Sequence, residues 1–351
     1  MASDFQPSLA ADPESGIFGL DDSAAEAKVH VLGVPFDATT SFRRGAAAGP
    51  EAILRASHQV ELLDLITGKP YEAGIYMHPI DDQVRAWNDE ARRSADPVIE
   101  AGGAERDPNL REYTEKVDGI QEQLNRWVQE RVEASLKEGK LCAVVGGDHS
   151  VPLGAIQAHA RQHPGMGILH FDAHADLRVG FEGFRYSHAS IFDNVLKSCG
   201  QLGPLVQVGL RDVCEEELER IHESRRIHAL FDHEWARLKL SREPLINHIL
   251  RTLEPLPEEV YVSLDIDGLD PSLCPNTGTP VPGGLTWHET MLWLEALVDS
   301  GRRIVGFDLC EVAPGISANQ AAQGDAPSLG EGWDEIVGAR LLYRLIGFAL
   351  R

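Results

Sequence analysis

The sequence predicts an α/β fold in which a mainly parallel sheet is covered by helices on both faces. Seven apolar runs recur along the 351-residue chain, at residues 29–34, 141–145, 167–171, 205–208, 227–231, 260–264 and 304–309. Segments with helical periodicity separate most of these runs, and this alternation is typical of βαβ units. The runs are continuously apolar, without alternation between polar and apolar residues, which indicates strands that are buried on both faces.

The predicted helices fall at residues 110–136, 152–161, 189–198, 244–253, 286–299 and 333–348, because apolar side chains recur there with a helical period. The first 27 residues are polar and contain Pro and Gly, so we expect an N-terminal arm that is loose unless it docks. Residues 81–111 are charged and only weakly periodic, which indicates an excursion between two core strands. No convincing linker follows, and we expect a single domain over residues 28–351.

Charge and composition exclude several classes of function. Lys and Arg number 32 against 55 Asp and Glu, which gives a formal net charge of −23. Nucleic acids and anionic membranes need basic surfaces, so we expect neither as a partner. No run approaches the roughly 18 apolar residues that span a bilayer, and the chain does not open with a signal peptide pattern. The five cysteines form no C-x-x-C pair, which favours free thiols in the reducing cytoplasm.

Three of the predicted strands are each followed by a burst of Asp and His. The three bursts read Gly-Gly-Asp148-His149-Ser150, Asp172-Ala-His174-Ala-Asp176 and Asp265-Ile-Asp267. Ligands of open parallel sheets bind outside the carboxyl ends of the strands, so these bursts should converge on one crevice. Alternate residues of an extended chain point to the same side, which would turn the Asp and His residues toward a common point.

A buried crevice lined by four carboxylates and two imidazoles requires cations. Without them, mutual repulsion would force the acids to take up protons or would unfold the site. Two divalent ions carry four positive charges, which balance four carboxylates beside neutral imidazoles. A single D-x-D at a strand end is commonly a turn or cap, and it is the three bursts together that predict a metal site. No cysteine takes part, which argues against a structural zinc site. The oxygen-rich set with two imidazoles suits manganese, nickel or iron better than calcium.

The segments GGDHS, FDAHADLR and SLDIDGLDPS resemble the metal-binding signatures of the ureohydrolase family, which includes arginases, agmatinases and guanidine hydrolases. The resemblance continues through GVPFDATTSFRRGAAAGPEAIL, VGLRD, TGTPVPGGLT and GFDLCEVAP. It implies a three-layer α/β/α fold with an eight-stranded parallel sheet, assembled as trimers or hexamers. It also implies a small cationic guanidino substrate and a reaction that splits the guanidinium group to release urea.

Carried onto this chain, the ligand pattern of the family gives the first ion His149, Asp172, Asp176 and Asp265. The second ion receives His174, Asp172, Asp265 and Asp267, so that two aspartates bridge the pair. The resemblance implies that both ions hold a water, lower its pKa and produce a hydroxide that attacks the guanidinium carbon. Asp176 matches the residue that orients this hydroxide and helps to move its proton.

Two further positions match family residues that act on the substrate. Glu311 matches the glutamate that holds the guanidinium through a charge-assisted contact. His188 matches the histidine that carries a proton to the leaving amine, although taken alone it would be an ordinary residue at a helix start.

Departures from the arginase pattern bear on the substrate. Two residues that contact the amino-acid head group in arginases are replaced here by Cys214 and Arg178, so arginine is not expected. Residues 176–192 and 273–289 look most like the guanidine hydrolase branch, which is associated with nickel. We therefore expect guanidine first, then an N-alkylated guanidine or biguanide, then agmatine or a guanidino acid, and we place nickel slightly ahead of manganese. Trp287 would either narrow the pocket or pack at a helix start.

A function of a different class stays open at this point. Members of such families can act as scaffold subunits in hetero-oligomers with a related chain. A subunit of that kind should have lost metal ligands, whereas this chain keeps all six together with Glu311 and His188.

Overall fold

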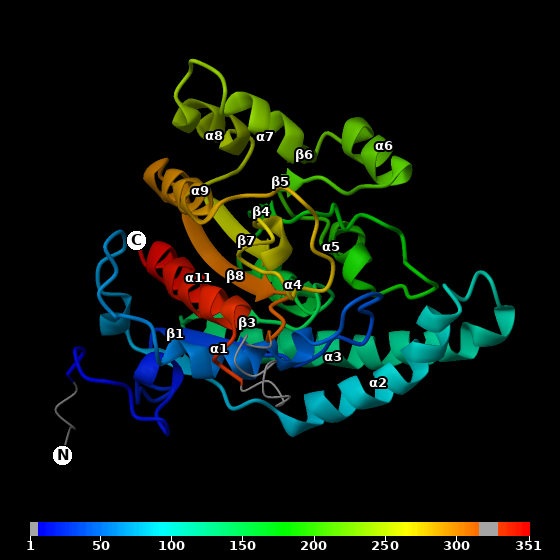
Figure 1. The fold of residues 1–351 in the computed structure, drawn as a ribbon, viewed down its shortest axis with the longest axis horizontal. Helices are drawn as coiled ribbons and strands as arrows, with labels where there is room; N and C mark the ends of the chain where they lie inside the picture. Colours follow the sequence, from blue (N-terminus) through cyan, green and yellow to red (C-terminus); the bar gives the residue numbers. More distant parts are fainter. Residues whose placement is uncertain (1–5, 316–328) are drawn as a thin grey trace.

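The computed structural model describes residues 6–315 and 329–351. Within these residues, eight strands form one sheet in the order β2-β1-β3-β8-β7-β4-β5-β6, and neighbouring strands are parallel (Figure 1). The strands are β1 (Val29–Gly33), β2 (Ile75–Met77), β3 (Leu141–Val145), β4 (Gly167–Phe171), β5 (Leu205–Leu210), β6 (Ile227–Phe231), β7 (Glu259–Asp265) and β8 (Arg303–Cys310). The predicted α/β fold with an eight-stranded parallel sheet is therefore confirmed.

All seven apolar runs of the sequence form strands, and β1, β4 and β5 are buried along their whole length. The sequence did not indicate β2, which is three residues long and lies at the edge of the sheet. Its side chains at Tyr76 and Met77 are only half-buried, so the segment carries too little apolar character to be recognised.

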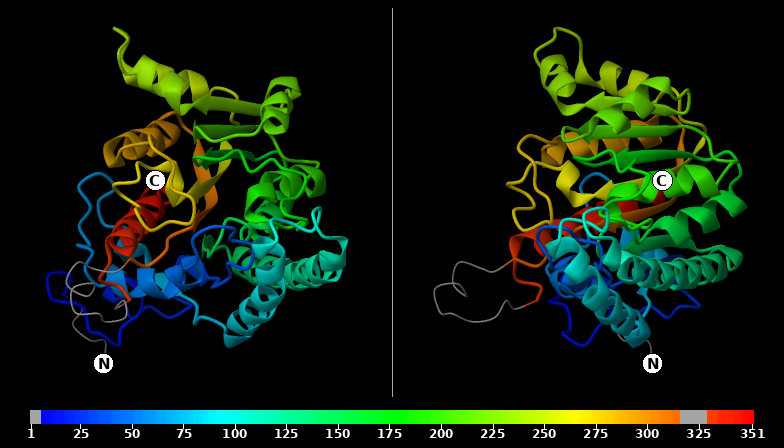
Figure 2. Two further views of the ribbon diagram at one scale, coloured as in Figure 1. Left: turned by 45° about the vertical axis from the view of Figure 1, so that its right-hand side comes forward. Right: turned by 90° about the vertical axis from the view of Figure 1, so that its right-hand side faces the viewer.

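Helices cover both faces of the sheet (Figure 2). On one face lie α1 (Gly49–Ser57), α9 (Trp287–Asp299) and α11 (Trp333–Ala349), and on the other lie α3 (Arg111–Lys137), α4 (Leu153–Gln162) and α5 (Ile191–Ser198). Successive residues of β3 face opposite layers: Ala143 and Val145 join the core that includes α11, whereas Cys142 and Val144 join the core that includes α3. The helices α6 (Glu215–Glu223), α7 (Asp232–Leu238) and α8 (Leu245–Leu253) lie between β5 and β7 in the chain.

The predicted excursion at residues 81–111 forms the 19-residue helix α2 (Asp82–Glu100), which packs along α3 (Figure 1). Asp81 caps its first turn by accepting a hydrogen bond from the main-chain nitrogen of Gln83. The buried face of α2 consists largely of small or polar residues, namely Val84, Ala91, Ser94, Ala95 and Val98. This composition explains why the helical period is weak in the sequence.

Part of the predicted N-terminal arm is docked. Ile17, Phe18 and Leu20 are buried in the main core, and the Phe18 ring lies 4.8 Å from that of Tyr343. The main-chain nitrogen of Phe18 donates a 2.7 Å hydrogen bond to Ser57 Oγ on α1. Residues 1–5 lie outside the described residues, and the division of the chain at residue 27 stays a prediction. In the part of the chain that is described, no helix has the length and apolar character needed to cross a membrane.

Candidate metal centre

Four adjacent central strands bring the predicted site residues to one edge of the sheet. In the order β3, β8, β7 and β4, these strands end at or just before His149, Glu311, Asp265 and Asp172. The convergence expected from the strand ends is therefore present in the structure, and Glu311 enters the site from β8, between β3 and β7. Parallel strands place their carboxyl ends at a common edge, which is why residues far apart in the chain meet here.

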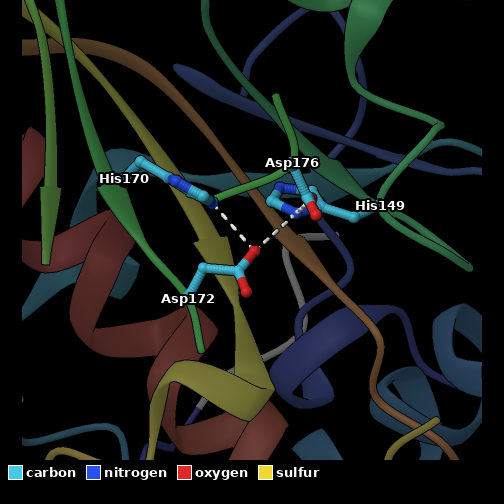
Figure 3. Close-up of side chains that lie close together, drawn as sticks. All are labelled: His149, His170, Asp172 and Asp176. Carbon is cyan, nitrogen blue, oxygen red and sulfur yellow. Dashed lines mark hydrogen bonds and ion pairs between the residues drawn. The ribbon is translucent and has the colours of Figure 1, made fainter. Parts of the chain in front are cut away.

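The first group of site residues surrounds one nitrogen of His149 (Figure 3). His149 Nδ1 lies 3.0 Å from Asp172 Oδ2 and 3.0 Å from Asp176 Oδ2. It also lies 3.5 Å from Asp265 Oδ2, which Figure 3 does not draw. All four side chains are buried. These are the four residues that the resemblance assigns to the first ion.

The second group surrounds His174, whose Nδ1 lies 3.1 Å from Asp267 Oδ2 and 3.3 Å from Asp172 Oδ1. Asp172 thus faces the first group with Oδ2 and the second with Oδ1, which is the position that a bridging carboxylate would need. Asp265 is close to both groups as well, because its Oδ1 accepts a 2.8 Å hydrogen bond from the main-chain nitrogen of Asp267.

The backbone at the site includes unusual conformations. Asp176 has φ of 54° and Glu311 has φ of 61°, in the left-handed region that non-glycine residues seldom adopt. The extended alternation expected for the segment after β4 therefore does not continue through Asp176, which reaches the first group from a left-handed backbone conformation instead. At Gly268 a Cβ atom would lie 2.6 Å from the main-chain nitrogen of Asp172, so glycine is required for the ends of β4 and β7 to approach.

Burial and mutual repulsion raise the pKa values of two of these acids, whereas neighbouring imidazoles lower that of Asp172. Burial and the nearby charges of Asp267 and Asp172 raise the pKa of Asp265 well above its usual range. Burial and the charge of Asp172 raise the pKa of Asp176 to about 7. Burial also opposes ionisation of Asp172, but the electrostatic influence of the His170 ring and hydrogen bonds from the surrounding imidazoles hold its pKa well below the usual range. The acids therefore need positive charge among them, and the two groups fit a pair of divalent cations.

The sequence did not single out His170, which is fully buried and close to the first group (Figure 3). Gln207 Nε2 donates to the main-chain oxygen of Ala175 at 2.8 Å and to His170 Nδ1 at 2.9 Å. His170 Nδ1 is thus an acceptor, and the proton on Nε2 is donated to Asp172 Oδ2 at 2.9 Å. His170 therefore orients the carboxylate of Asp172, the predicted bridging ligand, and has no lone pair to offer a metal ion.

Two more contacts orient predicted ligands, and neither was found from the sequence. His149 Nε2 lies 3.0 Å from Ser263 Oγ, which donates to Asp308 Oδ1 at 3.0 Å, so His149 Nδ1 stays directed at the carboxylates. Arg211, the arginine of VGLRD, donates to the main-chain oxygen of Asp267 at 2.6 Å and so fixes the turn that carries this residue. Ser263 and Asp308 are polar residues inside strands that are buried on both faces. This pattern is the signal in the sequence from which the contact of His149 with Ser263 could have been predicted.

Glu311 places one free oxygen in the site. Its Oε1 accepts a 3.0 Å hydrogen bond from the main-chain nitrogen of His149, while Oε2 is buried and has no partner among the described residues. Burial and the neighbouring charge of Asp148 raise the pKa of Glu311 well above its usual range. An uncompensated buried carboxylate oxygen is costly, and a cationic ligand would stabilise it.

His188 lies at the start of the short 3₁₀ turn η5 (His188–Ser190), where its main-chain nitrogen donates to Thr39 Oγ1 at 3.1 Å. Removal of the ring from water and the charge of His174 lower the pKa of His188 to about 4. The ring is therefore neutral at pH 7.

The three predicted specificity residues have different surroundings. Arg178 Nε lies 3.8 Å from Glu217 Oε2, and its guanidinium stacks 5.0 Å from the Phe181 ring centre. Cys214 is half-buried at the start of α6, next to this pair, and its main-chain nitrogen donates to Glu217 Oε2 at 3.1 Å. Trp287 is half-buried and packs against the main core from the first turn of α9.

Comparisons with known proteins agree with this arrangement. The sequence model of the arginase family matches residues 27–326. An N(1)-aminopropylagmatine ureohydrolase of Thermus thermophilus is 36% identical, with 94% of each chain covered. An agmatinase of Bacillus anthracis is 31% identical over 83% of this chain and 86% of its own. The structure of proclavaminate amidino hydrolase from Streptomyces clavuligerus shares the fold, with a TM-score of 0.65 and 24% identity over 98% of this chain and 95% of that one. The chain therefore belongs to the arginase family of ureohydrolases.

Proposed function

We propose that this chain uses two divalent metal ions to hydrolyse an amine-tailed guanidino compound of the agmatine type, with release of urea. The observation that carries the proposal is the pair of carboxylate and imidazole groups that share Asp172, beside the unpartnered Oε2 of Glu311. Two cations bound there would supply the positive charge that lowers the pKa of a water molecule. Nickel and manganese both suit the donors, and the test below uses each of them.

Three residues of the chain would bind the substrate and move the proton in this reaction. Glu311 binds the guanidinium through Oε2, because its Oε1 is held by the His149 main chain. Asp176 faces the first group with Oδ2, which leaves its other carboxylate oxygen to accept a proton from the attacking water. His188 is neutral at pH 7 and can carry this proton to the departing amine. Burial of the carboxylates keeps competing water away from these contacts and strengthens each of them.

The surroundings of Arg178 and Cys214 support a substrate with an ammonium tail. A substrate carboxylate would need a free cation, whereas Arg178 is engaged by Glu217 and Phe181. The loop around Cys214 carries exposed acids that suit an ammonium group, namely Asp212, Glu215 and Glu216. The two curated relatives described above are named for substrates with amine tails, in agreement with this chemistry.

Free guanidine, the first choice from the sequence, has no tail that could use these acids. The relatives reported above give it no specific support, and we therefore rank it below agmatine-type amines. Its N-alkylated derivatives and guanidino acids stay further alternatives, and arginine is the substrate that the site favours least.

The experiment is a urea-release assay on the purified protein loaded separately with nickel and with manganese. We expect kcat/KM for N(1)-aminopropylagmatine or agmatine to exceed that for guanidine and for arginine by about tenfold or more, which corresponds to about 1.4 kcal/mol from the tail contacts. The Asp172→Asn variant serves as the control that lacks the shared carboxylate. Efficient arginine hydrolysis would contradict the substrate proposal, and release of no urea from any of these compounds would contradict the activity.

We also propose that the chain assembles with itself, as a trimer or hexamer, and is active without a second kind of subunit. The proposal rests on the family resemblance and on the complete set of site residues in one chain. Light scattering of the purified chain gives its oligomeric mass, and the urea assay on the same fraction gives its activity. Activity that appears only after a related chain is added would instead favour the scaffold function.

A further inference from the structure

Helix α2 holds the loop that follows β1 through one arginine. Arg92 Nη1 lies 2.9, 3.0 and 3.1 Å from the main-chain oxygens of Asp37, Ala38 and Thr40. The Arg92 side chain is largely buried, and its Nε forms a 3.0 Å ion pair with Asp96 one turn further along α2. A single cation thus ties three carbonyl groups of this loop to the helix.

A second residue of α2 supports the same loop. Asn88 Oδ1 accepts a 2.8 Å hydrogen bond from the main-chain nitrogen of Asp37. Asp37 in turn accepts hydrogen bonds from the main-chain nitrogens of Gly45 and Ala47 at 3.1 and 3.2 Å, which closes the loop on itself. The loop around Thr39 is therefore anchored on both sides.

Thr39 connects this loop to a buried acid beside the predicted metal ligands. Its main-chain nitrogen and its hydroxyl donate to Asp148 Oδ2 at 3.2 and 2.8 Å. The other oxygen of Asp148 accepts hydrogen bonds from the main chain and the hydroxyl of Ser150. Because the hydroxyl proton of Thr39 is directed at Asp148, its oxygen can act only as an acceptor toward any other group.

The group that uses this acceptor is His188. Its main-chain nitrogen donates to Thr39 Oγ1 at 3.1 Å, and its ring Nδ1 lies 3.4 Å from the same oxygen and 3.4 Å from Ser187 Oγ. Nδ1 can approach Thr39 only as a donor, so it carries the ring proton and Nε2 is the nitrogen left to exchange protons. The same hydroxyl therefore fixes the place of His188 through its main chain and, together with Ser187 Oγ as a second acceptor, favours the tautomer with the proton on Nδ1.

We propose that Thr39 is a positioning residue for the reaction, held by α2 through Arg92 and acting on the proton carrier His188. The inference rests on the proposed function and adds a residue and a helix to it. It also gives the segment at residues 81–111 a role: α2 stabilises the loop that places the proton carrier.

The test compares Thr39→Val, which keeps the shape and removes the hydroxyl, with Thr39→Ser, which keeps the hydroxyl. We expect Thr39→Val to lower kcat by about tenfold or more, with KM within about twofold and two metal ions still bound, because only proton transfer is affected. Thr39→Ser should retain most of the activity. Ser150→Ala is the matched control, because it removes a hydroxyl from the other oxygen of Asp148 without touching His188. It should lower the Tm without the selective loss of kcat.

A double-mutant cycle then tests whether Thr39 affects kcat through His188. In the His188→Asn background, Thr39→Val should cause no further loss of kcat, because both changes remove the same contribution. Arg92→Met should lower kcat by the same factor in the wild-type protein, and it should cause no further loss of kcat in the His188→Asn protein. Losses that add in the double variant, or a Thr39→Val protein with normal kcat, would overturn the inference while leaving urea release by the wild-type protein intact. Absence of urea release by the wild-type protein would instead refute the proposed function.

Discussion

His170 offers a direct test of how the chain orients Asp172, the carboxylate that we propose to bridge two metal ions. The change His170→Phe keeps a ring of similar size against Phe192, whose centre lies 4.3 Å away, and removes the 2.9 Å hydrogen bond to Asp172 Oδ2. Hydrogen bonds to charged groups contribute about 1.5–3 kcal/mol, and about 1.4 kcal/mol corresponds to a factor of ten. We therefore expect metal affinity to fall by about 10- to 100-fold, the range typical of residues that orient metal ligands.

The assay is competition for nickel or manganese between the folded variant and a chelator of known affinity. The Tm is measured alongside, because the change leaves Gln207 without one acceptor and so costs some stability. His159→Phe is the control: this imidazole is also buried, but its Nδ1 contacts the main-chain oxygen of Ala155. A His170→Phe protein with a lower Tm but wild-type metal affinity would refute the orienting role.

Four further predictions follow from the contacts of single side chains. Glu311→Gln should lower kcat/KM by at least about a hundredfold with both ions retained, since the side chain would lose the charge that it offers through the free Oε2. Loss of metal from this variant would instead show that Glu311 is a metal ligand. His188→Asn should lower kcat by about 10²- to 10⁴-fold with little change in KM, as steady-state kinetics would show. Trp287→Ala should lower the Tm and leave substrate preference unchanged, because Trp287 packs on the core, and relaxed specificity would place it at the pocket. Burial raises the pKa of Asp118 to about 6, so the folded state binds more protons than the unfolded one and stability falls as the pH rises from about 4 to 7. Denaturation at pH 4 and pH 7 should show that the free energy of unfolding of Asp118→Asn rises relative to that of the wild type by at most about 3 kcal/mol between the two pH values. An equal dependence of the unfolding free energy on pH in both proteins would contradict the raised pKa.

The sheet could be predicted from the sequence because its strands are buried on both faces and therefore read as uninterrupted apolar runs. The same reasoning misses β2, which is short and half-exposed, and it misjudges α2, whose buried face is built from small residues such as Ala91 and Ala95. Hydrophobic patterns report how much apolar surface is covered, and neither element covers enough to be recognised.

The candidate ligands could be predicted because strand ends of a parallel sheet meet at one edge. The residues that orient them could not, since their contacts join distant segments: Gln207 reaches His170 across neighbouring strands, and Thr39 reaches His188 across 149 residues. A weaker signal was present, because a glutamine or histidine inside a strand buried on both faces must find a polar partner.

The measurement that tests the account most directly is the initial rate of urea release against the number of metal ions bound per chain. Metal-free protein is titrated with nickel or manganese in the presence of N(1)-aminopropylagmatine, and bound metal is determined in the same samples. The two carboxylate and imidazole groups predict that the rate becomes maximal when two ions are bound per chain. A full rate with one ion, or with none, would contradict the shared site around Asp172.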